Sequence, residues 1–359
     1  MTEAVNFYKS VYENIKFDDS GNRVLSFTTV REEYNALKNG VGIRDISDSS
    51  LLEMRGKDCL DFLNRISTNL VKDIKTNRVA STIFTNENGG ILDRVTVANL
   101  DNIIFLLGSS AYRTKLFIWI NKYIIKEDIQ ISDHSAKYSK FEITGSQSRS
   151  FLSMFFGDLM DADESGFAFK VYFDRTEAYL IKKNEFGITK YIIICVHEDT
   201  QALLNFMQNH KSVFDLVMAG SDAYQAFRIK HGIPEAPAEL NDNYNPHEVN
   251  LTDDISFSKG SYIGQKAVSR FDSFGKAKEI LAVLVFDDEV SHSLWYSLFA
   301  EDNREAGIVT SIAKAIDAGK SIALAFIKKE FADEGTKLTA KDSHGQEFPV
   351  TVCCIPVKK

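Results

Sequence analysis

The stretch KGSYIGQKAVSR, residues 259–270, is the most informative part of the chain. Its two glycines permit tight backbone turns. Between and beside them, Tyr262 offers an aromatic face, Gln265 an amide and Lys259 a positive charge. Aromatic, amide and ammonium groups are the kinds of side chain that hold a polar organic ligand. We therefore take Lys259, Tyr262 and Gln265 as candidate ligand-binding residues.

A second informative stretch, FTNENGGILDRVTV at residues 84–97, is predicted to be a β-hairpin. Two strand-like runs flank the turn Glu87-Asn88-Gly89-Gly90, in which glycines supply positive φ angles. In the second run, strand alternation puts Asp93 on the same face as Ile91 and Val95. An unsatisfied polar group on an apolar face costs roughly 2–7 kcal/mol. Asp93 is therefore expected either to be hydrogen-bonded or to take part in chemistry; the alternative is an acid near the hairpin end that solvent still wets.

The order of predicted elements indicates an α+β architecture. Residues 51–133 are predicted as strand, helix, three strands, helix and strand, and a second round begins near residue 140. Helices segregated between antiparallel strands are typical of α+β folds. After about Lys276 the pattern changes to short strands separated by turns, which predicts a small all-β barrel. We predict an α/β region at 1–275, made of two units at about 1–135 and 136–275, and a barrel domain at 276–359.

Composition and charge exclude several classes of protein. The chain has 359 residues and a net charge of −8, which argues against binding nucleic acid through its phosphates. No run of 18 apolar residues occurs, so no membrane span is expected. The N-terminus lacks the apolar core of a signal peptide, which predicts a cytoplasmic protein. The four cysteines are scattered, with no metal-ligand or disulfide spacing, so we predict no metal site.

Taken together and in order, these stretches resemble the folate-binding glycine cleavage T-protein family. Further matching stretches are VGIRDIS with LLEMRGKDCLDFLNRISTN, FRIKHGIP, NPHE, and AGIVTS with SIALAFIKKEF. The resemblance implies two ferredoxin-like α/β units that form a folate-binding aminomethyltransferase fold, plus a C-terminal β-barrel. It also implies tetrahydrofolate as cofactor. The best-known branch of the family transfers a one-carbon unit to folate from an aminomethyl group on a lipoyl carrier protein, with release of ammonia.

The resemblance assigns roles to individual residues. It makes Asp93 the catalytic acid, placed against the folate nitrogen that receives the carbon. It makes Arg228 a folate-binding residue, since a permanently charged guanidinium suits a carboxylate or a pterin carbonyl. The alternative for Arg228 is an arginine that stabilises a helix C-terminus. Asn245 and Glu248, within NPHE, are expected to cap and shape their loop.

Three departures from the T-protein branch bear on the ligand pocket. Arg94 stands where that branch has a second aspartate, and Asp48 replaces a histidine. The acid that pairs with the pterin ring aligns with Ile192, which offers no hydrogen bond. Glu185 is the candidate to take its place. These departures predict an altered folate pocket.

Three functions follow as alternatives. The first is a tetrahydrofolate-dependent one-carbon transferase resembling an aminomethyltransferase. The second is a folate-binding accessory protein of iron–sulfur cluster maintenance, the branch whose motif residues 259–270 resemble. That branch has a cysteine where this chain has Ser261, and an acid where it has Lys266. The third is a family fold whose pocket serves another ligand or a protein partner.

Overall fold

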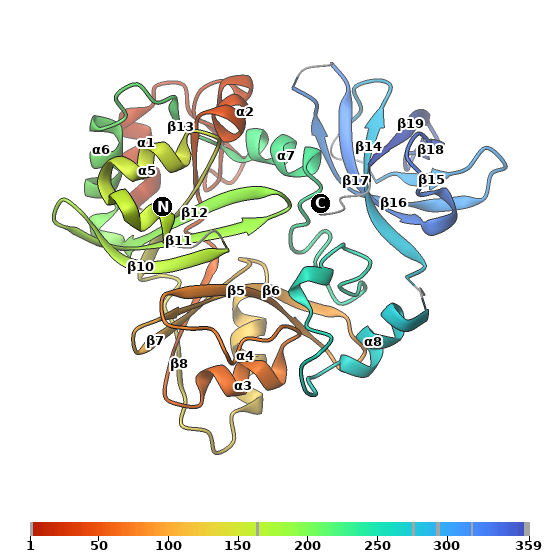
Figure 1. Cartoon of the computed structure of the whole chain (residues 1–359). Helices are drawn as coiled ribbons and strands as arrows, with labels where there is room; N and C mark the ends of the chain where they lie inside the picture. Colours follow the sequence, from red (N-terminus) through yellow and green to blue (C-terminus); the bar gives the residue numbers. More distant parts are fainter. Residues whose placement is uncertain (1–2, 163–164, 275–276, 292–294, 317–318, 355–359) are drawn as a thin grey trace. The chain divides into compact units, whose positions relative to one another are not determined.

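The computed structural model describes residues 3–162, 165–274, 277–291, 295–316 and 319–354 (Figure 1). It divides into two compact units, and each is made of several chain segments. Unit 1 comprises Met1–Leu63, Val71–Ser81 and Val95–Tyr224; unit 2 comprises Asn64–Leu70, Thr82–Arg94 and Gln225–Lys359.

The largest sheet of unit 1 has six strands in the order β10-β11-β12-β9-β3-β13. β3 pairs with β13 in parallel, whereas every other pair in the sheet is antiparallel. The strands are β3 (Val41–Asp45), β9 (Tyr138–Thr144), β10 (Gly166–Phe173), β11 (Thr176–Glu185), β12 (Ile188–Val196) and β13 (Leu216–Met218). The sheet therefore joins an early strand to four strands from the middle of the chain and a later one.

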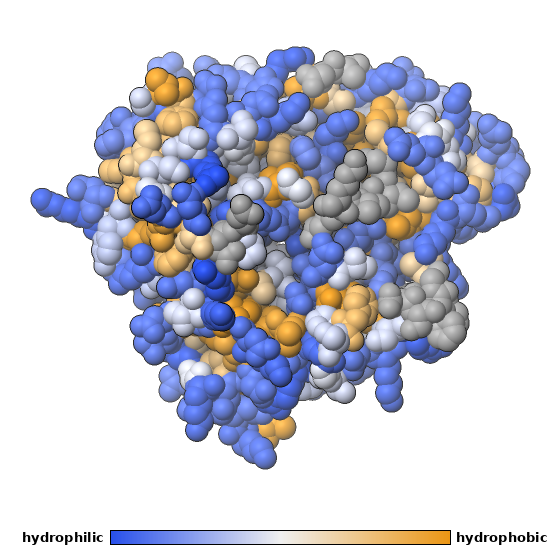
Figure 2. All heavy atoms as spheres, in the orientation of Figure 1, coloured by the Kyte–Doolittle hydropathy of each residue, from blue (hydrophilic) through white to orange (hydrophobic). Residues whose placement is uncertain are grey.

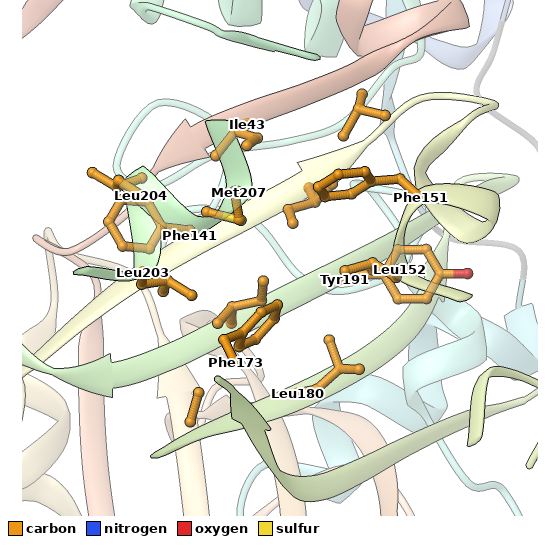
Figure 3. Close-up of a cluster of buried hydrophobic side chains, with 14 of the residues drawn as sticks. Ile43, Phe141, Phe151, Leu152, Phe173, Leu180, Tyr191, Leu203, Leu204 and Met207 are labelled. Carbon is orange, nitrogen blue, oxygen red and sulfur yellow. The ribbon is translucent and has the colours of Figure 1, made fainter. Parts of the chain in front are cut away.

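One face of this sheet carries the main hydrophobic core of unit 1 (Figure 3). Phe141 and Tyr191 project from the sheet toward Phe151 of one helix and Leu203 and Met207 of another, and all five are buried. The helices of this unit are α1 (Glu3–Val11), α2 (Val30–Asn39), α5 (Ser148–Phe156) and α6 (Thr200–Asn209), with a short ribbon of β1 (Lys16–Phe17) and β2 (Val24–Ser26). Burial of large apolar side chains from both layers is the main term that holds them together.

A five-stranded sheet packs against the other face. Its order is β5-β6-β7-β4-β8. Its elements are β4 (Ser50–Arg55), α3 (Cys59–Ile66), β5 (Arg78–Thr85), β6 (Ile91–Leu100), β7 (Ile103–Gly108), α4 (Arg113–Tyr123) and β8 (Gln130–Asp133). Leu51, Phe105 and Ala98 from this sheet share a core cluster with Ile181 and Ile192 of the six-stranded sheet. The predicted order of elements over residues 51–133 is confirmed.

Unit 2 contains a closed barrel with the strand sequence β14-β17-β16-β15-β18-β19. The strands are β14 (Glu279–Phe286), β15 (Ser297–Phe299), β16 (Glu305–Lys314), β17 (Ser321–Lys328), β18 (Lys337–Lys341) and β19 (Glu347–Cys354). Leu284, Leu298, Ala325 and Val350 point into its buried core. The predicted barrel and the α+β class are thus confirmed. The predicted domain boundary at 275–276 lies outside the described residues.

Two helices of the C-terminal half frame the informative stretch at 259–270. α7 (Ser221–Lys230) precedes it, and α8 (Gln265–Phe274) begins within it. The sequence analysis did not predict α8, because the two glycines that precede it were interpreted as turn residues. The short 3-10 helices are η1 (Gly157–Asp161), η2 (His197–Asp199), η3 (Thr252–Asp254) and η4 (Lys329–Phe331).

Hydrophilic residues predominate on the face drawn in Figure 2, and the hydrophobic ones form several separate groups. Large exposed apolar side chains come from well-separated points of the sequence, among them Ile118, Val213 and Trp295. No helix within the described ranges is long and apolar enough to cross a membrane.

Candidate functional site

Asp93 lies on β6, three residues after the glycine pair of the hairpin, and its side chain is fully buried (0% exposed). Its Oδ1 accepts a hydrogen bond from the backbone N–H of Arg94 at 2.9 Å. The burial predicted from strand alternation is confirmed, and the alternative of a solvent-wetted acid is excluded. A buried, hydrogen-bonded carboxylate has a fixed direction, which acid–base chemistry needs.

Arg94, the departure next to Asp93, forms a buried ion pair. Its Nε donates to Oδ2 of Asp254 at 2.6 Å, and both side chains are about nine-tenths buried. Asp254 ends η3, five residues before Lys259. An arginine here therefore joins strand β6 to the segment that leads into the informative stretch.

The stretch at residues 259–270 and the hairpin at residues 84–97 contact each other within unit 2. The Oγ1 of Thr85 donates to the backbone carbonyl of Ile263 at 2.7 Å. A Cβ built on Gly264 would lie 2.4 Å from the carbonyl oxygen of Asn86, and one on Gly89 would lie 3.0 Å from Ala267. The hairpin that carries Asp93 thus packs directly on the start of α8.

Of the two glycines in the stretch, Gly264 alone adopts a positive φ, +82°. Backbone approach and positive φ both require glycine at this position. Gly260 has ordinary φ, and a Cβ built there meets nothing within 4 Å. The structure therefore requires glycine at position 264, whereas position 260 has room for a side chain.

Lys259 is buried, and its ammonium group is held by backbone oxygens. Nζ donates to the carbonyls of Ser67 and Asn69, both at 2.6 Å, and lies 5.1 Å from the ring centroid of Tyr262. Burial lowers the pKa of Lys259 to about 8. The structure thus gives Lys259 an anchoring role for the stretch.

Tyr262 and Gln265 have polar atoms that no other described residue engages. Only 8% of the surface of Tyr262 is exposed to solvent, and this burial raises the pKa of its hydroxyl to about 12. Gln265 is half-buried and is the first residue of α8. Its side-chain amide and the hydroxyl of Tyr262 are the groups that a ligand could pair with here.

Arg228 lies in the last turn of α7 and is almost completely buried. Its Nη1 donates to Oε2 of Glu239 and to the carbonyl of Ile233, both at 3.2 Å, and its Nη2 donates to Ser311 at 2.7 Å. Nε donates to Gln225 at 2.7 Å. The guanidinium therefore links the end of α7 to the following loop and to barrel strand β16. A folate group that approached Arg228 would find these N–H donors already used in hydrogen bonds.

Asn245 and Glu248 shape their loop. Oδ1 of Asn245 accepts from the N–H of His247 at 2.9 Å, and Oε2 of Glu248 accepts from the N–H of Asn245 at 3.1 Å. Burial raises the pKa of Glu248. The predicted capping role is confirmed.

A second group of buried charges lies in unit 1, and the sequence analysis missed most of it. We call it the charged row: Lys183, Glu185, Lys190, Glu142 and Arg44, from strands β11, β12, β9 and β3. Along the row the ion-pair distances are 3.3, 2.7, 3.2 and 3.1 Å. Three cations alternate with two carboxylates. A charged residue inside an otherwise apolar strand was the signal, as it was for Asp93.

The charged row lies beside Ile192, one of the departures from the T-protein branch. Ile192 faces Glu142 across the β12–β9 pair and belongs to the core cluster between the two sheets. Glu185, the candidate to replace the missing acid, is the last residue of β11. Its carboxylate is bound by Lys190 and Lys183. Both acids near Ile192 are therefore paired with lysine.

Electrostatics stabilise the charged state of the row. Burial on its own would raise the pKa of Glu142, but Lys190 and Arg44 outweigh it and hold that pKa below its usual value. Burial on its own would lower the pKa of Lys190, yet Glu142 and Glu185 hold it above its usual value. Both directions agree that the pair is ionised.

The remaining departures lie at the surface. Asp48, Ser261 and Lys266 are exposed.

Cys59 and Cys195 are buried, and burial raises their pKa values to about 11 and about 12, which makes them unreactive apolar residues. The side chain of Cys354 lies outside the described residues. No group of three or more metal-binding side chains occurs in the part of the chain that the structure describes.

The fold and the paired stretches identify the class of protein. The family model described as the GCVT N-terminal domain matches residues 2–259, and that of the glycine cleavage T-protein C-terminal barrel domain matches residues 281–358. The chain belongs to the glycine cleavage T-protein family. The resemblance read from its sequence is confirmed at this level.

Curated relatives and a solved structure agree with this assignment. An aminomethyltransferase of Staphylococcus carnosus is 26% identical over 325 residues, covering 88% of this chain and 86% of the relative. One of Staphylococcus haemolyticus is 25% identical over 348 residues, covering 91% and 92%. The crystal structure of glycine cleavage system aminomethyltransferase T from Bartonella henselae matches with a TM-score of 0.84 at 16% identity, over 98% of this chain and 96% of that one. This last match shows the shared fold.

Proposed function

We propose that this chain is a tetrahydrofolate-dependent aminomethyltransferase, with Asp93 as its catalytic carboxylate. The observation that carries the proposal is the position of Asp93: it is buried on β6 and its Oδ1 is held by a backbone N–H. Membership of the T-protein family supports the substrate class. A carboxylate held in this way suits the orientation of a folate amine or proton transfer to and from it.

Four other residues were predicted to bind folate, and their surroundings divide them into two pairs. We propose that Tyr262 and Gln265 contact the ligand, because their hydroxyl and amide groups have no partner among the described residues. Lys259 and Arg228 would act indirectly, since their donors hold backbone and side-chain oxygens of unit 2. On this view Lys259 and Arg228 preserve the shape of the site.

The donor of the one-carbon unit is proposed from the relatives and from the family resemblance. The curated relatives are named aminomethyltransferases, which supports an aminomethyl group as donor, and the resemblance to the T-protein branch implies that a lipoyl carrier protein bears it. Most of the rate enhancement would come from holding donor and folate in register. A role in iron–sulfur maintenance would call for a thiol where the chain has Ser261, so transfer is the function that we propose.

A titration with tetrahydrofolate tests the ligand. We expect wild type to bind, and Gln265→Leu and Tyr262→Ala each to weaken binding by about 10-fold, as expected for loss of one hydrogen bond or ring contact in a site. Ser261→Ala is the matched control, because Ser261 lies in the same stretch but is exposed. Absence of binding to wild type at high micromolar folate would refute the proposed function.

A further inference from the structure

We propose that Arg94 is a positioning residue for Asp93, with Asp254 as the anchor of its side chain. The proposal rests on the function proposed above for Asp93. It starts from the fact that Arg94 takes part in two interactions at once: its backbone N–H binds the carboxylate of Asp93, and its guanidinium binds Asp254.

The geometry of a β-strand connects these two interactions. Successive side chains point to opposite faces, so Asp93 and Arg94 leave β6 in opposite directions. Their shared peptide group carries the N–H that reaches Oδ1 of Asp93 at 2.9 Å. Fixing the Arg94 side chain on one face therefore restrains the donor that orients the carboxylate on the other.

The anchor itself is held firmly. Asp254 belongs to residues 252–264, which we call the strap. The backbone oxygen of Asp254 accepts from Oγ1 of Thr68 at 2.6 Å, and the N–H of Ser256 donates to the oxygen of Thr68 at 3.1 Å. Lys259 binds the carbonyls on either side of Thr68. The strap thus has several attachments in unit 2 besides Arg94, and Arg94 joins it to β6 beside Asp93.

The pairing also accounts for the residue type. A buried aspartate such as Asp254 needs a partner of opposite charge, and the Nε–H of a guanidinium donates a charge-assisted hydrogen bond to it. A second acid at position 94, as in the T-protein branch, would deprive the buried carboxylate of Asp254 of this cation. The chemistry of the strap and the residue after Asp93 therefore fit together.

Arg94→Met tests this inference by hydrogen exchange and by kinetics. In exchange, we expect the backbone amide of residue 94 to exchange at least 10-fold faster than in wild type, because the peptide group that carries this N–H is no longer held in place. In transfer assays, we expect kcat to fall about 10- to 100-fold with the KM for tetrahydrofolate changed less than about 2-fold. Asp254→Asn should have the same two effects, and Arg94→Lys should restore part of kcat.

Val350→Ala, in the buried core of the barrel, provides the control for general destabilisation. It should lower the melting temperature without altering exchange at residue 94 or kcat. Unchanged exchange at residue 94 in Arg94→Met would overturn the inference whether or not the protein is a transferase. Faster exchange with full kcat would also overturn it, since Asp93 would then not depend on Arg94. If wild type shows no transfer, the proposed function fails, and the exchange result still decides whether Arg94 restrains the peptide group.

Discussion

The two units hold their buried charges in different ways. In unit 1 the charged row runs across neighbouring strands, where the register of one sheet brings Arg44 opposite Glu142 and Lys183 opposite Lys190. In unit 2 the ion pair of Arg94 and Asp254 joins residues 160 positions apart in the sequence. The row stabilises a sheet that its strands already form, whereas the pair in unit 2 fixes a loop against the strand of Asp93. This difference shows that buried charge alone does not mark a functional site. The structural elements that a buried ion pair links decide whether it supports a sheet or a site.

The largest effect is expected from breaking the row at its centre. Lys190→Met would leave Glu142 and Glu185 buried without their shared cation, so the free energy of unfolding should fall by about 3–5 kcal/mol. Urea denaturation measures this. Lys170→Met is the control in the same sheet, because the Lys170–Glu177 pair is about half exposed and its loss should change the free energy of unfolding much less. Equal losses of unfolding free energy in Lys190→Met and Lys170→Met would contradict the distinction between the buried row and an exposed ion pair.

The second largest effect on stability is expected where the strap packs on the hairpin of residues 84–97. Gly264→Ala should lower the free energy of unfolding by about 2–4 kcal/mol, because the new methyl group would meet the Asn86 carbonyl and the residue would keep a positive φ. Gly260→Ala is the matched control and should be close to neutral. Thermal or urea unfolding of both variants makes the comparison. A tolerated Gly264→Ala would show that the two stretches do not pack closely.

A smaller effect should appear in the pH dependence of stability. The folded protein lowers the pKa of Lys259 to about 8 from 10.5, so between these values the unfolded chain binds a proton that the folded chain does not. The free energy of unfolding of wild type should therefore rise with pH across this window relative to Lys259→Met, by on the order of 2 kcal/mol. Urea unfolding at pH 7.5 and 10 measures the difference. Parallel behaviour of the two proteins would mean that Lys259 is not buried as described.

Much of the fold could be predicted from the sequence because its signals are local. The alternation and turn residues over 51–133 and in the barrel predicted strands that the structure confirms. The parallel pairing of β3 with β13 joins distant parts of the sequence, and no local sequence pattern predicts it. The start of α8 was missed because Gly264, which directly precedes Gln265, was interpreted as part of a turn.

At the candidate site, burial was predictable and partners were not. Alternation along β6 predicted that Asp93 is buried, because that argument needs one strand alone. The engagement of Arg228 by Glu239 and Ser311 depends on how helix, loop and barrel meet, which a sequence does not specify locally. The same holds for Asp254, the partner of Arg94. Alternation in β9 and β12 could have revealed Glu142 and Lys190 as buried charges, and we did not apply it there.

The most direct test of the account is aminomethyl transfer to tetrahydrofolate by wild type and by Asp93→Asn. The substrate for the assay is an aminomethylated lipoyl carrier protein, and formation of methylenetetrahydrofolate is measured. We expect wild type to turn over and Asp93→Asn to bind tetrahydrofolate equally while kcat falls about 10²-fold or more, because the amide cannot serve as the acid–base group. Full turnover by Asp93→Asn with unchanged folate binding would contradict the central claim that Asp93 is the catalytic carboxylate.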